Sequence, residues 1–364
     1  MALHFHPLTV KRVAPDAAGS AAITFAVPLQ LRETFDFKPG QFLTLRATIE
    51  GRETRRSYSI CSPHQRFEDA LEIDVGIKPV EGGTFSPWAI QNLGEGASIE
   101  VLPPDGRFTP RMTGARHRVG FAAGSGITPI LSIIATTLAA EPGSRFTLVY
   151  GNQRTNTIMF NEALQDLKDR YPARLSLIHM LSRQPQEMAL LNGRLDENKV
   201  AELLSGLLPA DSIDEAFICG PEGMIACVEK ALRGGGVSTD RIHSERFFSS
   251  DNSAIRQPNL PPAEKQPGRL HEGHSLHVVL DGKTHHMQMS GRDHVLDVAL
   301  DAGLDLPYSC RGGVCCTCRA RVLEGEVTMD KNFTLEQWEI DKGFVLTCQA
   351  RPVSREVRVS YDER

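Results

Sequence analysis

The stretch PYSCRGGVCCTCRARV, residues 307–322, carries a close group of cysteines, and a further one follows along the chain. In the order C-x4-C-x2-C and then a distant C, these are Cys310, Cys315, Cys318 and Cys348. Four thiolates with this spacing are typical of a [2Fe–2S] cluster. Gly312 and Gly313 allow the loop to turn back on itself, so we expect its backbone N–H groups to point at the sulfur atoms. The sequence therefore predicts a centre that carries one electron at a time.

A zinc site is the alternative explanation of these cysteines. Zinc sites usually take their ligands from two close C-x2-C pairs, whereas here three cysteines crowd one loop and the fourth is distant. The pattern therefore favours the iron–sulfur cluster. Cys316 lies inside the loop beside a ligand, and we expect it to point to the other side of the chain and to pack as a small buried residue.

The composition sets the class of protein. The chain has 364 residues, of which 41% are hydrophobic and 23% charged, and this suits two or three ordinary globular domains. The net charge of −5 argues against a nucleic-acid partner. Eight cysteines, half of them expected metal ligands, and a start without an apolar signal-peptide core predict a cytoplasmic protein.

The secondary-structure pattern changes near residue 112. From residue 5 to about 110, short β-type runs such as LTVKRV, AITFAVP and FLTLRAT are separated by Gly, Pro and Asp, which predicts an antiparallel β-barrel. From residue 118 to 247, apolar strands alternate with helices, as in FTLVYG followed by FNEALQDLKDRY. That alternation predicts an α/β domain with a parallel sheet and right-handed crossovers, the usual pattern of a nucleotide-binding domain.

One apolar stretch needs a separate interpretation. Residues Val119 to Ala140 contain no charged side chain and are numerous enough for a membrane span. Gly124, Gly126 and Pro129 interrupt the stretch, so we interpret it as a buried strand, a turn and a helix. We therefore expect no membrane partner.

A Pro-rich segment, residues 249–269, separates the α/β domain from the cysteine loop and predicts an extended linker. After it, a hairpin through Asp281-Gly282 and a short helix in HVLDVALDAG are expected to precede the loop. We therefore divide the chain into a barrel at 1–112, an α/β domain at 113–248, the linker at 249–269 and a cluster domain at 270–364.

The run RSYS, at the end of a barrel strand, is the first candidate ligand site. Arg56 can pair with a diphosphate, and Tyr58 offers a ring and a hydroxyl to a flavin. Ser59 is small enough to lie against the reacting ring while donating a hydrogen bond. An exposed strand with a surface Arg and a half-buried Tyr is the alternative interpretation of the same tetrapeptide.

Two glycine-containing turns that open helices favour bound phosphates. In the run from Gly82 to Ser86, free backbone N–H groups and the hydroxyls of Thr84 and Ser86 can cradle a phosphate, although a plain helix start is the alternative. In the run from Gly124 to Pro129, the glycines allow the backbone to approach a pyrophosphate. This second turn lacks the third Gly of G-x-G-x-x-G, but the strand before it and the helix after it favour a nucleotide.

Cys219-Gly220-Pro221 follows another strand pattern, EAFI, and Met224 lies on the first turn of the next helix. Open α/β sheets bind ligands at the carboxyl ends of their strands, so Cys219 can lie beside a nicotinamide ring. A buried Cys at the end of a strand is the alternative.

In this order along the chain, R-x-Y-S, G-G-x-x-S, G-S-G-I-T-P, Y-G-N, C-G-P and the four cysteines resemble the ferredoxin–NADP reductase family with a plant-type ferredoxin fused at the C-terminus. The resemblance covers nearly all 364 residues. It implies FAD in the barrel, a nicotinamide dinucleotide in the α/β domain and an α+β ferredoxin domain of the β-grasp type. Cys316 departs from the family, in which Ala or Gly is usual, and it makes the loop easier to oxidise.

The resemblance also implies which residues contact each cofactor. The flavin is expected to contact Arg56, Tyr58, Ser59, Gly83, Thr84, Ser86, Glu245 and Phe247. The nicotinamide dinucleotide is expected over Gly124, Ser125, Gly126, Thr128, Tyr150, Gly151, Asn152, Cys219, Gly220 and Met224. Three of these are the expected catalytic residues: Ser59 and Cys219 would hold the nicotinamide near the flavin, and Glu245 with Ser59 would pass the proton.

NADPH is expected in preference to NADH. No Asp or Glu follows FTLVYGN closely to bind a ribose 2′-hydroxyl. Ser182-Arg183 resembles the Ser-Arg pair that binds the 2′-phosphate in plant-type reductases. The alternative is that Arg154 and Arg183 are solvated loop residues.

These parts predict an electron-transfer enzyme. Nicotinamide gives two electrons as hydride and an iron–sulfur cluster accepts one, so a flavin, which is stable at both levels, has to lie between them. The chain has no paired E-x-x-H motif of a di-iron site, so the oxygenation is expected in a separate partner. The resemblance favours a di-iron oxygenase that acts on an aryl-CoA thioester. A Rieske dioxygenase or a ketosteroid hydroxylase is the alternative partner, and a non-catalytic module that binds zinc and a nucleotide is the alternative function.

Overall fold

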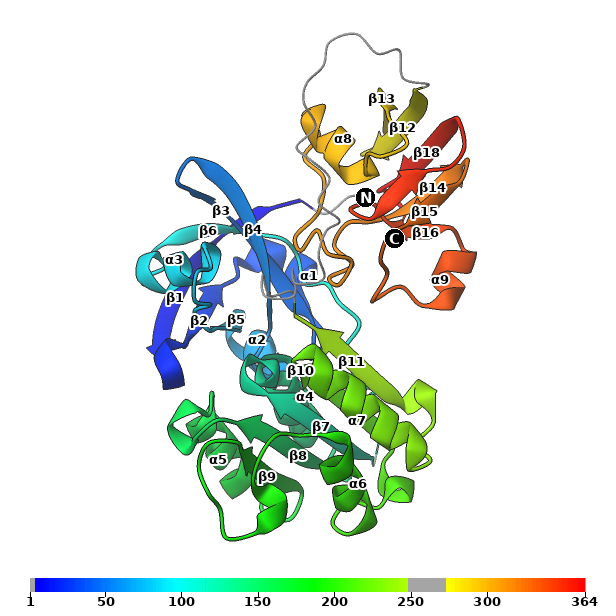
Figure 1. The fold of residues 1–364 in the computed structure, drawn as a ribbon. Helices are drawn as coiled ribbons and strands as arrows, with labels where there is room; N and C mark the ends of the chain where they lie inside the picture. The colour runs from blue at the N-terminus through cyan, green and yellow to red at the C-terminus, as the bar shows by residue number, and fades with distance from the viewer. Residues whose placement is uncertain (1–3, 115, 248–272, 364) are drawn as a thin grey trace. The chain divides into compact units, whose positions relative to one another are not determined.

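The computed structural model describes residues 4–114, 116–247 and 273–363 (Figure 1). The chain divides into two compact units, a larger one with residues 6–54 and 58–247 and a smaller one that contains the C-terminal module. The predicted linker, 249–269, lies outside the described residues. None of the helices in the described ranges is both long and apolar enough to cross a bilayer.

The first domain of the larger unit is an antiparallel β-barrel, as predicted. Its six-stranded sheet has the order β4-β3-β6-β1-β2-β5. The strands are β1 His6–Pro15, β2 Ala21–Ala26, β3 Phe42–Ile49, β4 Arg52–Ser59, β5 Glu72–Ile77 and β6 Ser98–Val101. A bridge between Ile60 and Val75 joins the chain just after β4 to β5, so the two edge strands meet. The short helices are α1 Arg32–Phe35, α2 His64–Ala70 and α3 Phe85–Asn92.

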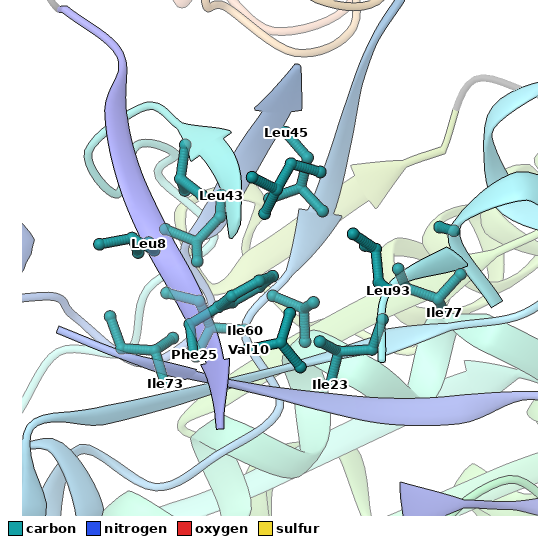
Figure 2. Close-up of a cluster of buried hydrophobic side chains, with 14 of the residues drawn as sticks. Leu8, Val10, Ile23, Phe25, Leu43, Leu45, Ile60, Ile73, Ile77 and Leu93 are labelled. Atoms are coloured by element: carbon teal, nitrogen blue, oxygen red, sulfur yellow. The ribbon is translucent and has the colours of Figure 1, made fainter. Parts of the chain in front are cut away.

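Alternating strand residues fill the barrel, as Figure 2 shows. Successive side chains of a strand point to opposite faces, so Leu8 and Val10 of β1 both face the interior. Ile23 and Phe25 of β2 join them, and none of these four side chains is more than 1% exposed. Removal of this apolar surface from water stabilises the closed barrel.

The second domain of the larger unit is the predicted α/β domain. Its five-stranded sheet has the order β11-β10-β7-β8-β9, and every neighbouring pair is parallel. The strands are β7 His117–Ala123, β8 Arg145–Asn152, β9 Leu175–Leu181, β10 Glu215–Gly220 and β11 Ile242–Arg246. The helices are α4 Ile127–Ala140, α5 Asn161–Arg170, α6 Glu197–Ser205 and α7 Glu222–Gly234. Residues 119–140, the uncharged stretch, form β7, a single 3₁₀ turn and α4.

Both faces of the parallel sheet are covered. Leu148 and Tyr150 of β8 pack in one apolar cluster with residues of α4 and α5. Val149, on the other face, packs in a second cluster with residues of α6 and α7. The sequence pattern does not predict β11, because its residues IHSER are mostly polar, and in the structure they are half-buried.

The C-terminal module has a five-stranded sheet of order β13-β12-β18-β14-β16 and a two-stranded sheet of β15 and β17. The strands are β12 His274–Leu280, β13 Lys283–Met289, β14 Arg319–Glu324, β15 Val327–Met329, β16 Phe344–Leu346, β17 Ala350–Pro352 and β18 Glu356–Ser360. The helices are α8 Val295–Asp301 and α9 Gln337–Asp341. The predicted hairpin joins β12 to β13, and both turn residues have positive φ, 50° at Asp281 and 74° at Gly282. This mixed sheet with short helices confirms the expected α+β ferredoxin fold.

Candidate functional site

Ser59, Cys219 and Glu245 are far apart in the sequence but lie together in the larger unit. Cys219 and Glu245 are register partners on the parallel strands β10 and β11. The Ser59 hydroxyl, at the end of β4, donates a hydrogen bond to Glu245 Oε2 over 3.1 Å. Ser59 is 4% exposed and Cys219 is fully buried. The fold therefore brings the three predicted catalytic side chains to one place.

The surroundings of this group keep it uncharged. Burial raises the pKa of Glu245 to about 8, and the hydrogen bond from Ser59 acts in the opposite direction. Burial, and then the Glu245 carboxyl, raise the pKa of the Cys219 thiol well above its usual value. Both side chains are consequently neutral near pH 7, and Glu245 carries a proton that it can release.

Aromatic and cationic side chains accompany Ser59. Tyr58 is half-buried, and its ring packs against Phe85 of α3 with the centroids 5.9 Å apart. Arg56 is exposed, and its guanidinium donates to the carbonyl of Arg55 over 2.8 Å. Phe247 packs half-buried against the apolar cluster that contains Cys219. These side chains suit a flavin, because the exposed guanidinium can pair with its diphosphate and the half-buried rings can pack against its isoalloxazine.

The loop before α3 is the predicted phosphate cradle. Val80 closes it, because its N–H donates to Ser86 Oγ over 3.0 Å and its carbonyl accepts from the Gly83 N–H over 2.9 Å. A Cβ atom on Gly83 would lie 3.0 Å from that carbonyl, so a larger residue would crowd this turn. Ser86 is buried and holds the loop, while Thr84 is exposed at the start of α3. The Ser86 hydroxyl accepts this bond and can also donate its own proton to a ligand oxygen.

The glycine turn after β7 is packed closely against β10. Gly124 has a φ of +53°, and a Cβ on Gly126 would lie only 2.1 Å from the Cys219 carbonyl oxygen. The Thr128 hydroxyl donates to the Ser125 carbonyl over 3.0 Å, which closes the turn at the start of α4. The missing side chain at Gly126 therefore allows the turn to pack against β10, while the half-buried Gly124 leaves backbone at the carboxyl edge of the sheet, where a pyrophosphate can approach.

Gly220 and Met224 complete this edge. A Cβ on Gly220 would lie 2.7 Å from Met224 Cε, so the Met side chain occupies the space that this glycine leaves. Met224 is 8% exposed and belongs to the cluster on the other face of the sheet. Its described contacts are those of a packing residue.

The carboxyl ends of β8 and β9 hold the remaining predicted nucleotide residues. Tyr150 is fully buried, and its hydroxyl donates to the Gly124 carbonyl over 2.8 Å, so it lies beneath the glycine turn. Ser182 bonds the Asn152 carbonyl through its N–H at 2.9 Å and its hydroxyl at 3.3 Å. Arg183 is exposed beside it. The structure thus places Asn152, Ser182 and Arg183 at one edge.

Buried side-chain nitrogens without a hydrogen-bond partner among the described residues lie at the same edge, near the carboxyl ends of β8 and β9. The side-chain nitrogen of Asn152 is buried and has no hydrogen-bond partner among the described residues. His179 lies on β9 opposite Tyr150, and both of its ring nitrogens are also buried without a hydrogen-bond partner in the described part of the chain. Burial lowers the pKa of this imidazole. The unsatisfied Asn152 donor fits a polar ligand at this edge. Sequence analysis missed His179, since one His in an apolar strand carries no motif.

In the C-terminal module, the cysteine loop folds around its sulfur atoms as predicted. The Gly312 N–H donates to Cys310 Sγ over 3.3 Å. Of the two glycines expected to make the turn, Gly313 has a positive φ of 77°, while Gly312 does not. Two non-glycine residues also take left-handed conformations, Arg311 at 52° and Cys316 at 59°. The positive φ at Cys316 is a conformation that Gly adopts more readily than Cys, and the 7% exposure of Cys316 matches the expected packing role.

The four ligand candidates form two pairs. Within the described ranges, no three or more His, Cys, Asp or Glu side chains are placed to share a single metal ion. Hydrogen bonding with Cys315, and then backbone N–H groups that include Gly312, lower the pKa of Cys310 to about 6. Hydrogen bonding with Cys318 is the main cause that lowers the pKa of Cys348. Two thiol pairs suit a cluster of two irons better than one tetrahedral zinc.

Comparison with known proteins identifies the class. The family models described as "Oxidoreductase FAD-binding domain", "Oxidoreductase NAD-binding domain" and "2Fe-2S iron-sulfur cluster binding domain" match residues 11–109, 121–230 and 278–353. The chain therefore belongs to the ferredoxin–NADP reductase type of flavin-dependent, NAD(P)H-dependent oxidoreductases that carry a C-terminal 2Fe–2S ferredoxin domain.

The chain is similar along nearly its whole length to reductase components and to one subunit of oxygenase systems. Over 363 residues the chain is 42% identical to a subunit of the 1,2-phenylacetyl-CoA epoxidase of Escherichia coli (strain K12), and the match covers 99% of this chain and 98% of that protein. It is 34% identical to a "3-ketosteroid-9-alpha-monooxygenase, ferredoxin reductase component" of Rhodococcus rhodochrous, over 97% and 96% of the two chains. The solved structure of phthalate dioxygenase reductase shares the fold, with a TM-score of 0.59, 20% identity and 98% coverage of both chains.

Proposed function

We propose that this chain is the NADPH-dependent reductase component of a multicomponent oxygenase, and that its partner is a di-iron oxygenase of the phenylacetyl-CoA epoxidase kind. The observation that carries the proposal is one chain that holds both the Ser59–Glu245–Cys219 group and two pairs of cysteine thiols. When bound, FAD accepts a hydride and gives up electrons singly to a [2Fe–2S] cluster. The 42% identity to one chain of such an epoxidase supports the choice of partner.

Three residues carry the hydride step. Cys219 lies at the carboxyl end of β10 and keeps an uncharged thiol there, which provides an apolar wall for a nicotinamide ring. Ser59 orients the Glu245 carboxyl through its hydrogen bond. Glu245, protonated below about pH 8, supplies the proton that has to accompany the hydride.

Other residues bind the cofactors. Tyr58 and Phe247 would cover the flavin ring, and Arg56 would pair with the flavin diphosphate. The loop formed by Gly83, Thr84 and Ser86 would hold the same diphosphate at the start of α3. This assignment rests on the domain division 1–112, 113–248, 249–269 and 270–364, which we retain as part of the proposal.

NADPH rather than NADH is proposed from the edge formed by β8 and β9. Arg183 is exposed next to Ser182, and both follow β9 directly. A guanidinium and a hydroxyl together can bind a 2′-phosphate. Asn152, with its orphaned side-chain nitrogen, supplies a further donor for the dinucleotide.

An anaerobic titration of the purified protein tests the proposal. NADPH is expected to bleach the absorbance of both the flavin and the cluster, and chemical analysis is expected to find two irons and two sulfides per chain, as a [2Fe–2S] cluster requires. The protein is then expected to support turnover by phenylacetyl-CoA epoxidase catalytic subunits. Absence of iron together with absence of bleaching would refute the reductase function.

A ketosteroid monooxygenase is the second candidate partner, because 34% identity over 97% of this chain also relates it to such a reductase. Parallel reconstitution with the oxygenase components of each system separates the two. Faster turnover with the ketosteroid enzyme would overturn the choice of partner and leave the reductase function intact.

A further inference from the structure

Gln349, the residue after the fourth cysteine, is fixed in the turn between β16 and β17. Its N–H donates to the Leu346 carbonyl over 2.9 Å, and its carbonyl accepts from the Asp330 N–H over 3.0 Å. The residue is 6% exposed, although Gln is rarely buried to this extent. A buried amide has to find hydrogen-bond partners, so its contacts show what it does there.

The side-chain nitrogen of Gln349 points at three acceptors. It lies 3.0 Å from the Arg311 carbonyl, 2.8 Å from the Cys348 carbonyl and 3.7 Å from Cys348 Sγ. Two of these atoms are carbonyl oxygens and the third is a sulfur ligand, so the NH₂ group, and not the amide oxygen, must occupy this position. One amide thus connects the loop after Cys310 to the segment of the distant Cys348.

The cysteine loop is shaped to receive this side chain. Gly313 has a φ of +77°, and a Cβ atom there would lie 3.3 Å from Gln349 Cγ and 3.1 Å from the Lys331 carbonyl. The glycine therefore allows the Gln side chain to lie against the loop.

We propose that Gln349 is a positioning residue of the [2Fe–2S] site, an inference that rests on the cluster assigned in the proposed function. Its NH₂ group donates to the Arg311 and Cys348 carbonyls, which holds the Cys310 loop against the Cys348 segment, and it places its partial positive charge 3.7 Å from the Cys348 sulfur. A reduced cluster carries one more negative charge than an oxidised one, so donors near sulfur favour the reduced state. Gln349 therefore makes the midpoint potential less negative.

The test is a spectroelectrochemical titration of the full-length, cofactor-loaded protein with Gln349→Leu or Gln349→Glu. Loss of one hydrogen bond in Gln349→Leu is expected to lower the reduced-to-oxidised ratio at a fixed potential between about twofold and tenfold. Tenfold corresponds to about 59 mV for a one-electron couple. Gln349→Glu is expected to shift the potential further, because a carboxylate would face two carbonyl oxygens and a thiolate. Gln288→Leu is the matched control, since Gln288 is exposed on β13 and bonds the Ser275 hydroxyl.

An unchanged potential and an unchanged EPR spectrum in a fully loaded Gln349→Leu protein would overturn the inference. If that variant does not retain the cluster, pulsed EPR of the reduced wild-type protein with ¹⁵N in its glutamine side chains reads the contact directly. Detection of a ¹⁵N coupling supports the inference, and its absence overturns it. Reduction of the flavin by NADPH is expected to be unaffected in every variant, so loss of iron or of flavin reduction in the wild type would count against the proposed function instead.

Discussion

Replacing Glu245 by Gln is expected to stabilise the larger unit at pH 8 and to slow reduction of the flavin by NADPH. Gln has nearly the shape of a protonated Glu and can accept the hydrogen bond from Ser59, but it cannot ionise. The wild-type carboxyl has a pKa of about 8 in the folded protein, against 4.5 as its ordinary value. Between these values the folded state holds a proton that the unfolded state has lost, so wild-type stability falls as the pH rises from 4.5 to about 8.

The size of the effect follows from the pKa difference. Each unit is worth about 1.36 kcal/mol, so the change from 4.5 to about 8 sets an upper limit of about 5 kcal/mol. Glu245 keeps part of its surface exposed, and solvent therefore screens the buried charge to some extent. We expect about 2 kcal/mol, which raises the melting temperature of a domain of this size by about 4 to 8 °C.

Thermal unfolding of Glu245→Gln and wild type at pH 5 and pH 8, followed by circular dichroism, measures this effect. The gain in melting temperature is expected to be larger at pH 8, and Glu187→Gln, a change at an exposed carboxyl, is the control. Stopped-flow reduction of the flavin is expected to slow about 100-fold in Glu245→Gln, because the proton donor is lost. Equal stabilisation at both pH values would refute the conclusion that the folded protein keeps Glu245 neutral.

Three further changes test other parts of the molecule. Arg183→Ala is expected to raise the KM for NADPH at least about tenfold while leaving the KM for NADH nearly unchanged, measured by steady-state kinetics. Cys348→Ser is expected to abolish transfer to cytochrome c and to keep flavin reduction by NADPH; unchanged transfer would contradict the proposed route. Gly126→Ala is expected to lower the melting temperature, because its Cβ would meet the Cys219 carbonyl at 2.1 Å, whereas Gly223→Ala, which meets nothing within 4 Å, is expected to be tolerated.

The local parts of the fold could be predicted from the sequence because short-range patterns determine them. The alternation in FTLVYG, the Asp281-Gly282 turn and the cysteine spacing each depend on residues a few positions apart. The structure confirms the strands, the hairpin and the grouped thiols at these positions. The barrel and the parallel sheet follow from the same patterns, repeated along the chain.

The features that were missed depend on contacts between distant residues. Strand β11 has a polar, half-buried sequence, and only its pairing with β10 makes it a strand. The register that sets Glu245 beside Cys219 cannot be counted from the sequence, and neither can the hydrogen bond from Ser59. Family resemblance, and not the residue pattern, indicated Glu245.

The role of Gln349 was missed for the same reason. Its amide meets Arg311 only because the chain returns to the cysteine loop after β16. One signal was present, since a glutamine directly after an expected metal ligand is close enough to donate to the atoms around that ligand. The left-handed conformations of Arg311 and Cys316 carried no such signal, because neither residue type prefers positive φ.

The proposed electron path begins in an uncharged pocket near Ser59 and ends in a cysteine loop that stabilises negative charge on sulfur. Near Ser59, burial keeps the Cys219 thiol and the Glu245 carboxyl neutral, so an approaching hydride meets no fixed negative charge. In the cysteine loop, hydrogen bonding with Cys315, together with backbone N–H groups that point at sulfur, favours the thiolate form of Cys310. A hydride moves as a negative species and is best received in a neutral pocket with a proton at hand, whereas a cluster held by four thiolates needs donors to accept another electron. The same chain can therefore take electrons in pairs at one end and hold them singly at the other.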